Sequence, residues 1–188
     1  MTRSLSIAMT KMLFIAMIMV YVKYIKGVQM KKIESFQVNH LKLKRGIYVS
    51  RKDKVGENIV TTFDIRMKEP NREPVINTAE LHAIEHLGAT FLRNHPVYDT
   101  QTIYFGPMGC RTGLYVIFSG NLTSFDVYEI IKEMFLFIMN YEGDIPGADE
   151  ISCGNYQDMN LNMAKYEAAK FYNEVLLNIK DENLNYPE

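Results

Sequence analysis

The spacing of apolar residues changes at about residue 30. An unbroken apolar run of 11 residues, Met12–Val22, stands between two lysines. After residue 33, short apolar segments alternate with polar stretches and turn residues, which is the pattern of a folded domain. We therefore expect an N-terminal extension over residues 1–29 and one domain, large enough to bury a substantial core, over residues 30–188.

The domain is expected to contain both strands and helices. Apolar and polar side chains alternate from Ile59 to Met67, as in a strand with one buried face. Glycine, proline and asparagine mark the ends of the other segments. The expected strands are 59–67, 100–105 and 114–119, and the expected helices are 78–94, 125–141 and 156–179. The polar stretch that contains Gly46 and Gly56 is not assigned to an element.

The stretch Leu81–His86 in the first expected helix carries the pattern H-x-x-E-H. Positions i, i+3 and i+4 share one helix face, so His82, Glu85 and His86 should converge. Two imidazoles at this spacing can hold one metal ion, and the carboxylate beside them can move protons. Asn77 and Glu80 form a capping-box pattern that favours a helix start. A histidine pair at this spacing also occurs in proteins without a metal. Other residues must therefore show whether this pair is part of a metal site.

Two isolated cysteines, Cys110 and Cys153, supply further candidate chemistry. Neither lies in a C-x-x-C pattern, which favours ligands or nucleophiles in a reducing compartment over a single disulfide. Cys110 lies in a turn rich in glycine and proline. Cys153 is expected directly before the last helix, where the helix dipole favours a thiolate. Cys153 is therefore the better third ligand of an open His2Cys site, and Cys110 remains for acid–base or nucleophilic work.

Charge narrows the possible partners. The net charge is −1, but residues 1–29 carry four basic and no acidic side chains, which leaves 17 basic against 22 acidic residues in the domain. The domain shows no basic stripe, which argues against nucleic-acid binding. Asp64 and Arg66 lie two residues apart on one face of the first expected strand. They indicate either a solvated ion pair or a polar binding surface.

Residues 1–29 permit three interpretations. Their apolar run is shorter than the roughly 20 residues that span a bilayer. A basic start before an apolar core resembles a signal peptide, but no clear cleavage site follows. We favour Met30 as the working start of a cytoplasmic protein, with membrane contact only if residues 1–29 are retained.

Five separated motifs occur in one order along the chain. They are Glu34-Ser35-Phe36 followed by His40, Phe63-Asp-Ile-Arg66, Leu81-His-Ala-Ile-Glu-His86, Pro107-Met-Gly-Cys-Arg-Thr-Gly113 and Cys153-Gly154. Each is weak alone. Together, over residues 31 to about 180, they resemble the S-ribosylhomocysteine lyase (LuxS) family.

The resemblance implies a specific reaction. The family cleaves the thioether of S-ribosyl-L-homocysteine to homocysteine and 4,5-dihydroxy-2,3-pentanedione, the precursor of autoinducer-2, by carbonyl migration and β-elimination. The family's metal is ferrous iron, which zinc or cobalt can replace, and the residues matching its ligands are His82, His86 and Cys153. The residues matching the acid–base pair are Cys110 and Glu85.

The resemblance also implies a substrate pocket and an assembly. The positions matching Ser35, His40 and Arg66 line the pocket, with Asp64 beside them. The family is a homodimer with active sites at the subunit interface. The fold we expect is α+β, an antiparallel sheet of about four strands packed by helices. Three residues depart from the family's usual pattern and concern substrate affinity rather than the reaction: Asn39, Ala83 and Tyr104.

Two rival functions remain open at this point. H-x-x-E-H is also the signature of the inverted zinc metallopeptidases, whose third ligand is a downstream glutamate. Glu150 and Glu167 lie in that direction. A small metal-stabilised interaction module without catalytic activity is the other alternative.

Overall fold

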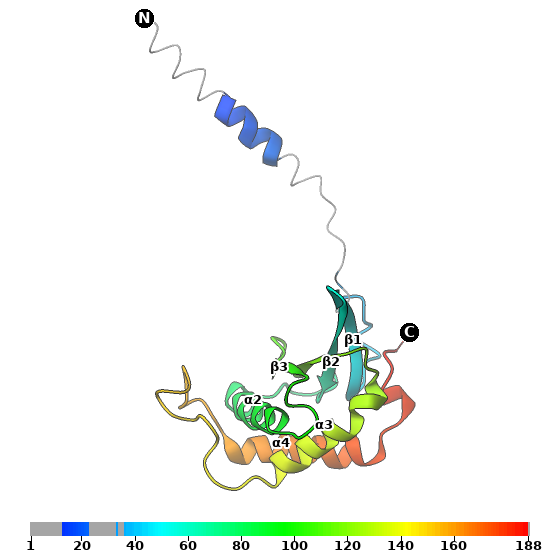
Figure 1. Ribbon diagram of the computed structural model, residues 1–188, viewed down its shortest axis with the longest axis vertical. Coiled ribbons are helices and arrows are strands. Elements are labelled where there is room, and N and C mark those ends of the chain that lie inside the picture. The colour runs from blue at the N-terminus through cyan, green and yellow to red at the C-terminus, as the bar shows by residue number, and fades with distance from the viewer. Residues whose placement is uncertain (1–12, 23–32, 34–35, 188) are drawn as a thin grey trace, which may run out of the picture. The chain divides into compact units, whose positions relative to one another are not determined.

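The computed structural model describes residues 13–22, 33 and 36–187. The chain divides into two compact units, residues 1–36 and 37–188. The first contains a helix over residues 13–22 (blue in Figure 1), and the large apolar side chains of this helix are exposed. Among the helices of the described residues, none combines the length and apolar character needed to cross a membrane.

An antiparallel sheet forms one layer of the second unit. Its strand order is β1-β2-β4-β3. The strands are β1 (Gly46–Val55), β2 (Asn58–Arg66), β3 (Thr102–Pro107) and β4 (Gly113–Ser119). The three expected strands correspond to β2, β3 and β4, and the α+β fold with a four-stranded antiparallel sheet is confirmed.

Strand β1 falls in the stretch that sequence reasoning left unassigned. Only its first residues are deeply buried, and its second half is largely exposed and charged. The alternation that marks a half-buried strand is therefore missing from the sequence. A tight turn joins β1 to β2, with Val55 paired to Asn58 and Gly56 at φ +62°, a backbone conformation that favours glycine.

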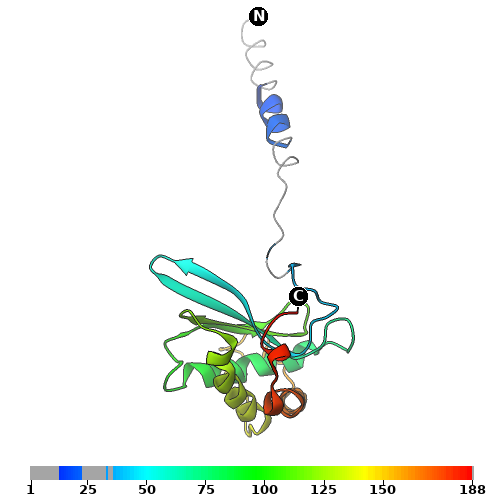
Figure 2. The ribbon, with the colours of Figure 1, turned by 90° about the vertical axis from the view of Figure 1, so that its right-hand side faces the viewer.

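Three helices cover one face of the sheet, as Figure 2 shows. They are α2 (Thr78–Arg93), α3 (Ser124–Met139) and α4 (Leu161–Glu174). The expected capping box is present, since the backbone N–H of Asn77 donates to Glu80 Oε2 at 2.8 Å. The largest fully buried core side chains include Phe63, Phe118, Phe135 and Phe171. This packing holds α2, which carries both histidines, against the sheet.

The last helix is shorter than expected. The predicted range was 156–179, but α4 begins at Leu161. The Asn160 side chain caps this helix by accepting a hydrogen bond from the backbone N–H of Met163. It ends at Glu174 and is followed by 3-10 turns at Leu176–Asn178 and Asp181–Asn183. Cys153 therefore lies in a loop eight residues before the helix. A helix dipole acts only within the first turn, so the predicted dipole effect on Cys153 was wrong.

Candidate active site

Helix α2 and the loop before α4 bring together three candidate metal ligands. One ligand atom from each of His82, His86 and Cys153 lies within 4.8 Å of the others, and all three residues are half-buried. Cys153 Sγ is 3.4 Å from His82 Nε2. Two imidazole nitrogens and one sulfur at this spacing can hold a metal ion, with a fourth position left for water or substrate.

Both histidine rings are oriented by backbone carbonyl groups. His82 Nδ1 lies 3.0 Å from the carbonyl oxygen of Asp158, and His86 Nδ1 lies 2.8 Å from that of Pro146. A carbonyl oxygen can only accept, so each Nδ1 carries a proton, and in the neutral ring Nε2 then presents a lone pair. Such outer contacts fix the tautomer of metal-binding histidines. The residues present therefore fit a metal ion.

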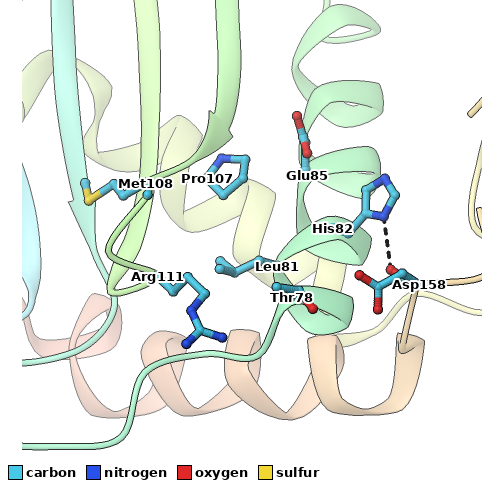
Figure 3. A pocket seen from close by; sticks show the side chains of 9 residues that line it. Thr78, Leu81, His82, Glu85, Pro107, Met108, Arg111 and Asp158 are labelled. Atoms are coloured by element: carbon cyan, nitrogen blue, oxygen red, sulfur yellow. Dashed lines mark hydrogen bonds between the residues drawn. The ribbon is translucent and has the colours of Figure 1, made fainter. Parts of the chain in front are cut away.

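Beside these ligands, a pocket of about 400 Å³ opens between α2 and the loop that joins β3 to β4. Figure 3 shows His82 and Glu85 on α2 opposite Pro107 at the end of β3 and Met108 of that loop. The lining residues are Thr78, Leu81, His82, Glu85, Pro107, Met108, Gly109, Arg111 and Asp158. Within the described part of the chain Glu85 has no hydrogen bond or ion pair, so its carboxylate is available for proton transfer in this pocket.

Cys110 lies on the same loop but contacts other groups. Its side chain is exposed, and its Sγ lies 3.1 Å from Thr112 Oγ1 and 3.8 Å from Arg66 Nη1. Burial acts to raise the pKa of the Cys110 thiol, but hydrogen bonds from Thr112 and the positive charge of Arg66 outweigh it. The pKa is therefore below its ordinary value, which favours the thiolate near neutral pH.

Arg66 and Asp64 form a buried ion pair rather than a solvated one. Their exposed fractions are 4% and 1%, which corrects the interpretation of this face as solvated. Arg66 Nη2 lies 2.5 Å from Asp64 Oδ2, and Arg66 Nη1 lies 2.5 Å from Thr112 Oγ1. Burial acts to lower the pKa of Arg66, but the Asp64 carboxylate raises it above its ordinary value. Among the described residues, neither Asp64 Oδ1 nor Arg66 Nε has a hydrogen-bond partner.

The remaining predicted pocket residues lie at the start of the domain. His40 is half-buried, and its Nδ1 lies 2.9 Å from the carbonyl oxygen of Val38. Ser35 lies outside the described residues.

Of the three residues expected to depart from the family pattern, Ala83 lies in α2 and Tyr104 lies in β3. Ala83 is buried in the core and cannot line the pocket. The hydroxyl of Tyr104 lies against Gly106, where an added Cβ would be 2.1 Å from that hydroxyl oxygen and 3.2 Å from Glu85 Oε1. A side chain at position 106 would therefore displace the Tyr104 hydroxyl, next to the candidate proton-transfer group.

Several polar partners of the site were not predicted. Thr112 lies in the Pro107–Gly113 motif, two residues after Cys110. This position could have indicated its hydroxyl as a hydrogen-bond partner of the thiol. The carbonyl groups of Pro146 and Asp158 carry no sequence signal, because every residue has one. Tyr186, whose hydroxyl donates to Asp64 Oδ2 at 2.9 Å, is distant in sequence from every motif.

The downstream glutamates do not join the histidines. Glu167 pairs with Lys68 at 2.6 Å, and both side chains are largely buried. Glu150 is exposed. In the described part of the chain, the cluster around His82 and His86 is completed by Cys153. Nothing here favours the metallopeptidase alternative.

Known proteins are similar to this chain over most of its length. The family model described as S-ribosylhomocysteinase (LuxS) matches residues 33–182. The S-ribosylhomocysteine lyase of Finegoldia magna is 63% identical over 159 residues, which cover 85% of this chain and 100% of the relative. The S-ribosylhomocysteine lyase of Clostridium beijerinckii is 60% identical over 158 residues, which cover 84% of this chain and 99% of the relative. That of Porphyromonas gingivalis strain ATCC 33277 is 57% identical over 159 residues, covering 85% and 100%. The chain therefore belongs to the S-ribosylhomocysteinase (LuxS) family.

Proposed function

We propose that this protein cleaves the thioether of S-ribosyl-L-homocysteine, with homocysteine and 4,5-dihydroxy-2,3-pentanedione as products. The observation that carries the proposal is the His82, His86 and Cys153 group, with ligand atoms within 4.8 Å of one another, beside the free carboxylate of Glu85. Membership of a family whose relatives are named for this reaction supports it.

The metal proposed for this site is ferrous iron, one per subunit, with zinc or cobalt as substitutes. His82, His86 and Cys153 would hold it. When bound, it supplies a Lewis acid that polarises oxygens of the sugar. Neutral imidazoles and a thiolate suit iron, zinc and cobalt better than magnesium or calcium, which prefer oxygen ligands.

Glu85 and Cys110 are proposed to move the protons. Migration of the carbonyl group requires a proton to leave one sugar carbon and another to be added at its neighbour. A thiolate at Cys110 and a carboxylate at Glu85 can each take a proton and return it. The last step removes one more proton next to the carbonyl and expels homocysteine as a thiolate, so no redox change occurs.

We propose that the active unit is a homodimer with its sites at the subunit interface. Cys110 is exposed and is absent from the lining of the pocket that Glu85 and His82 share, and its sulfur contacts Arg66 and Thr112 instead. A second copy that brings its Cys110 to this pocket would complete the site. The dimer would also cover the exposed thiol.

The substrate's amino-acid end is assigned to Arg66, Asp64, His40 and Ser35. Arg66 Nε and Asp64 Oδ1 are buried polar atoms without a partner in the described residues. Burying such atoms unpaired is costly, so a ligand that bonds to them would gain affinity. A carboxylate accepts from a guanidinium and an ammonium group donates to a carboxylate, which suits the two charged groups on the α-carbon of homocysteine.

Residues 30–188 are proposed as the catalytic domain, acting in the cytoplasm in autoinducer synthesis and in the methyl cycle. Residues 1–29 are proposed to lie outside it. Their exposed apolar helix and their four basic side chains would suit contact with an anionic membrane surface wherever this segment is retained.

A direct assay tests the proposed function. The purified protein, loaded with ferrous iron without oxygen, is incubated with S-ribosyl-L-homocysteine, and the released thiol is titrated. We expect one thiol for each substrate consumed and loss of release after chelation. Substrate that stays intact with a fully loaded protein would contradict the proposal.

A further inference from the structure

The C-terminal segment after α4 is hydrogen-bonded to residues at the start of β1. Tyr48 donates its hydroxyl to the carbonyl oxygen of Glu182 at 3.1 Å, and Asn183 Nδ2 donates to the carbonyl oxygen of Arg45 at 2.8 Å. Ser124 Oγ donates to the carbonyl oxygen of Leu184 at 2.9 Å. These contacts hold residues 182–184 beside the start of β1 and the start of α3.

Within this segment Tyr186 reaches the buried ion pair. Its ring stacks on Tyr48 with centroids 4.8 Å apart and planes at 12°. Its hydroxyl donates to Asp64 Oδ2 at 2.9 Å, and the same oxygen accepts from Arg66 Nη2 at 2.5 Å. The second terminal nitrogen of Arg66, Nη1, contacts Cys110 Sγ at 3.8 Å. A continuous set of polar contacts therefore runs from Tyr186 to the candidate catalytic thiol.

We propose that Tyr186 is a positioning residue, whose hydrogen bond keeps Asp64 ionised and oriented so that Arg66 stays in place beside Cys110. The inference rests on the proposed function, because it assumes the roles given to Arg66 and Cys110. Tyr186 lies beyond residue 182, where the match to the family model ends.

The charge state of Asp64 explains why one hydroxyl matters. Burial raises the pKa of the Asp64 carboxyl, and the Arg66 guanidinium and the Tyr186 hydroxyl act in the opposite direction. The other titratable groups that face it are His40, Tyr48 and Tyr115. A donor that bonds to the carboxylate lowers its pKa, so removal of the Tyr186 hydroxyl raises it. Asp64 then takes up a proton at a higher pH, and Arg66 loses its counter-ion.

The substitution Tyr186→Phe tests this while it keeps the stacked ring. With metal-loaded full chain, we expect the acid limb of the pH–rate profile for thiol release to move to higher pH. The loss in kcat/KM should thus be several-fold at the acid end and small at the alkaline end. Metal content should remain that of the unsubstituted protein. A uniform loss at every pH, or an unchanged profile, would overturn the inference.

Tyr128→Phe is the matched control. The Tyr128 hydroxyl donates to the carbonyl oxygen of Leu176 at 2.7 Å, away from the ion pair, so its removal should leave the profile in place.

A second measurement needs no substrate. The carboxyl carbon of Asp64, assigned in the NMR spectrum with Asp64→Asn, should titrate at higher pH in Tyr186→Phe than in the unsubstituted chain. An equal midpoint would refute the positioning role even in an active enzyme. A shifted midpoint in a protein that releases no thiol would instead reject the proposed function and keep the contact between Tyr186 and Asp64.

Discussion

The carbonyl oxygen of Asp158 holds the ring of His82 by accepting a hydrogen bond from its Nδ1, 3.0 Å away (Figure 3). The two residues are 76 positions apart. The contact turns Nε2 of His82 toward Cys153, and Pro146 orients His86 in the same way. Main-chain carbonyl groups therefore set the orientation of both imidazole rings.

Substitution of His82 by alanine should remove metal and activity together. Only two of the three candidate ligands would remain, which is too few for tight binding. Metal content by atomic emission and thiol release are measured on the same sample. His95→Ala, at a histidine that pairs with Glu133 instead, should retain both. An active, metal-free His82→Ala protein would contradict the ligand assignment.

Cys153→Ser separates the lyase from the metallopeptidase alternative. A neutral hydroxyl is a far weaker ligand than a thiolate, so the lyase should lose metal and thiol release. A site completed by Glu150 or Glu167 would keep its metal after this change. Metal content after dialysis against a weak chelator decides between the two outcomes.

Cys110→Ala should keep stoichiometric metal and yet abolish turnover. The thiol is not among the candidate ligands, and loss of an acid–base group costs about 10²–10⁴-fold in rate. Thiol release is measured beside metal content, with the iron-loaded unsubstituted protein as reference. Retained turnover would remove Cys110 from the mechanism.

Thr112→Val should raise the pKa of the Cys110 thiol. The hydrogen bond from the Thr112 hydroxyl favours the thiolate and depresses this pKa, so its loss moves the midpoint of thiol titration to higher pH, although the backbone hydrogen bond from residue 112 remains. At neutral pH less thiolate would then be present, and alkylation by iodoacetamide should slow several-fold. The rate is followed between pH 6 and 10, and peptide mapping confirms that Cys110 carries the label. A midpoint that stays in place or falls would show that Thr112 does not stabilise the thiolate.

A chain that begins at Met30 should fold, bind metal and turn over substrate. Among the described residues the buried core begins at Leu43, and the proposed pocket residues are all retained. Thiol release and Tm are compared with those of the full chain. Flotation with vesicles of phosphatidylcholine and phosphatidylglycerol should recover the full chain only. Failure of the shorter chain to fold would show that residues 1–29 belong to the domain.

The sequence alone determined the features that depend on neighbouring residues. The spacing of His82, Glu85 and His86 requires only a helix, and the capping residues Asn77 and Glu80 mark where that helix begins. Alternating apolar residues revealed β2 for the same reason. Local periodicity arises from backbone geometry, so it can be read from contiguous positions.

Only the tertiary structure decided which distant groups meet. It brought Cys153 to the histidines from a loop instead of a helix start, and it buried Asp64 and Arg66 where alternation allowed a solvated face. It also paired β1, whose exposed half lacks an apolar pattern, and it carried Tyr186 to Asp64 across 122 positions. Such contacts depend on how helices and strands pack together, and packing leaves no fixed spacing in the chain.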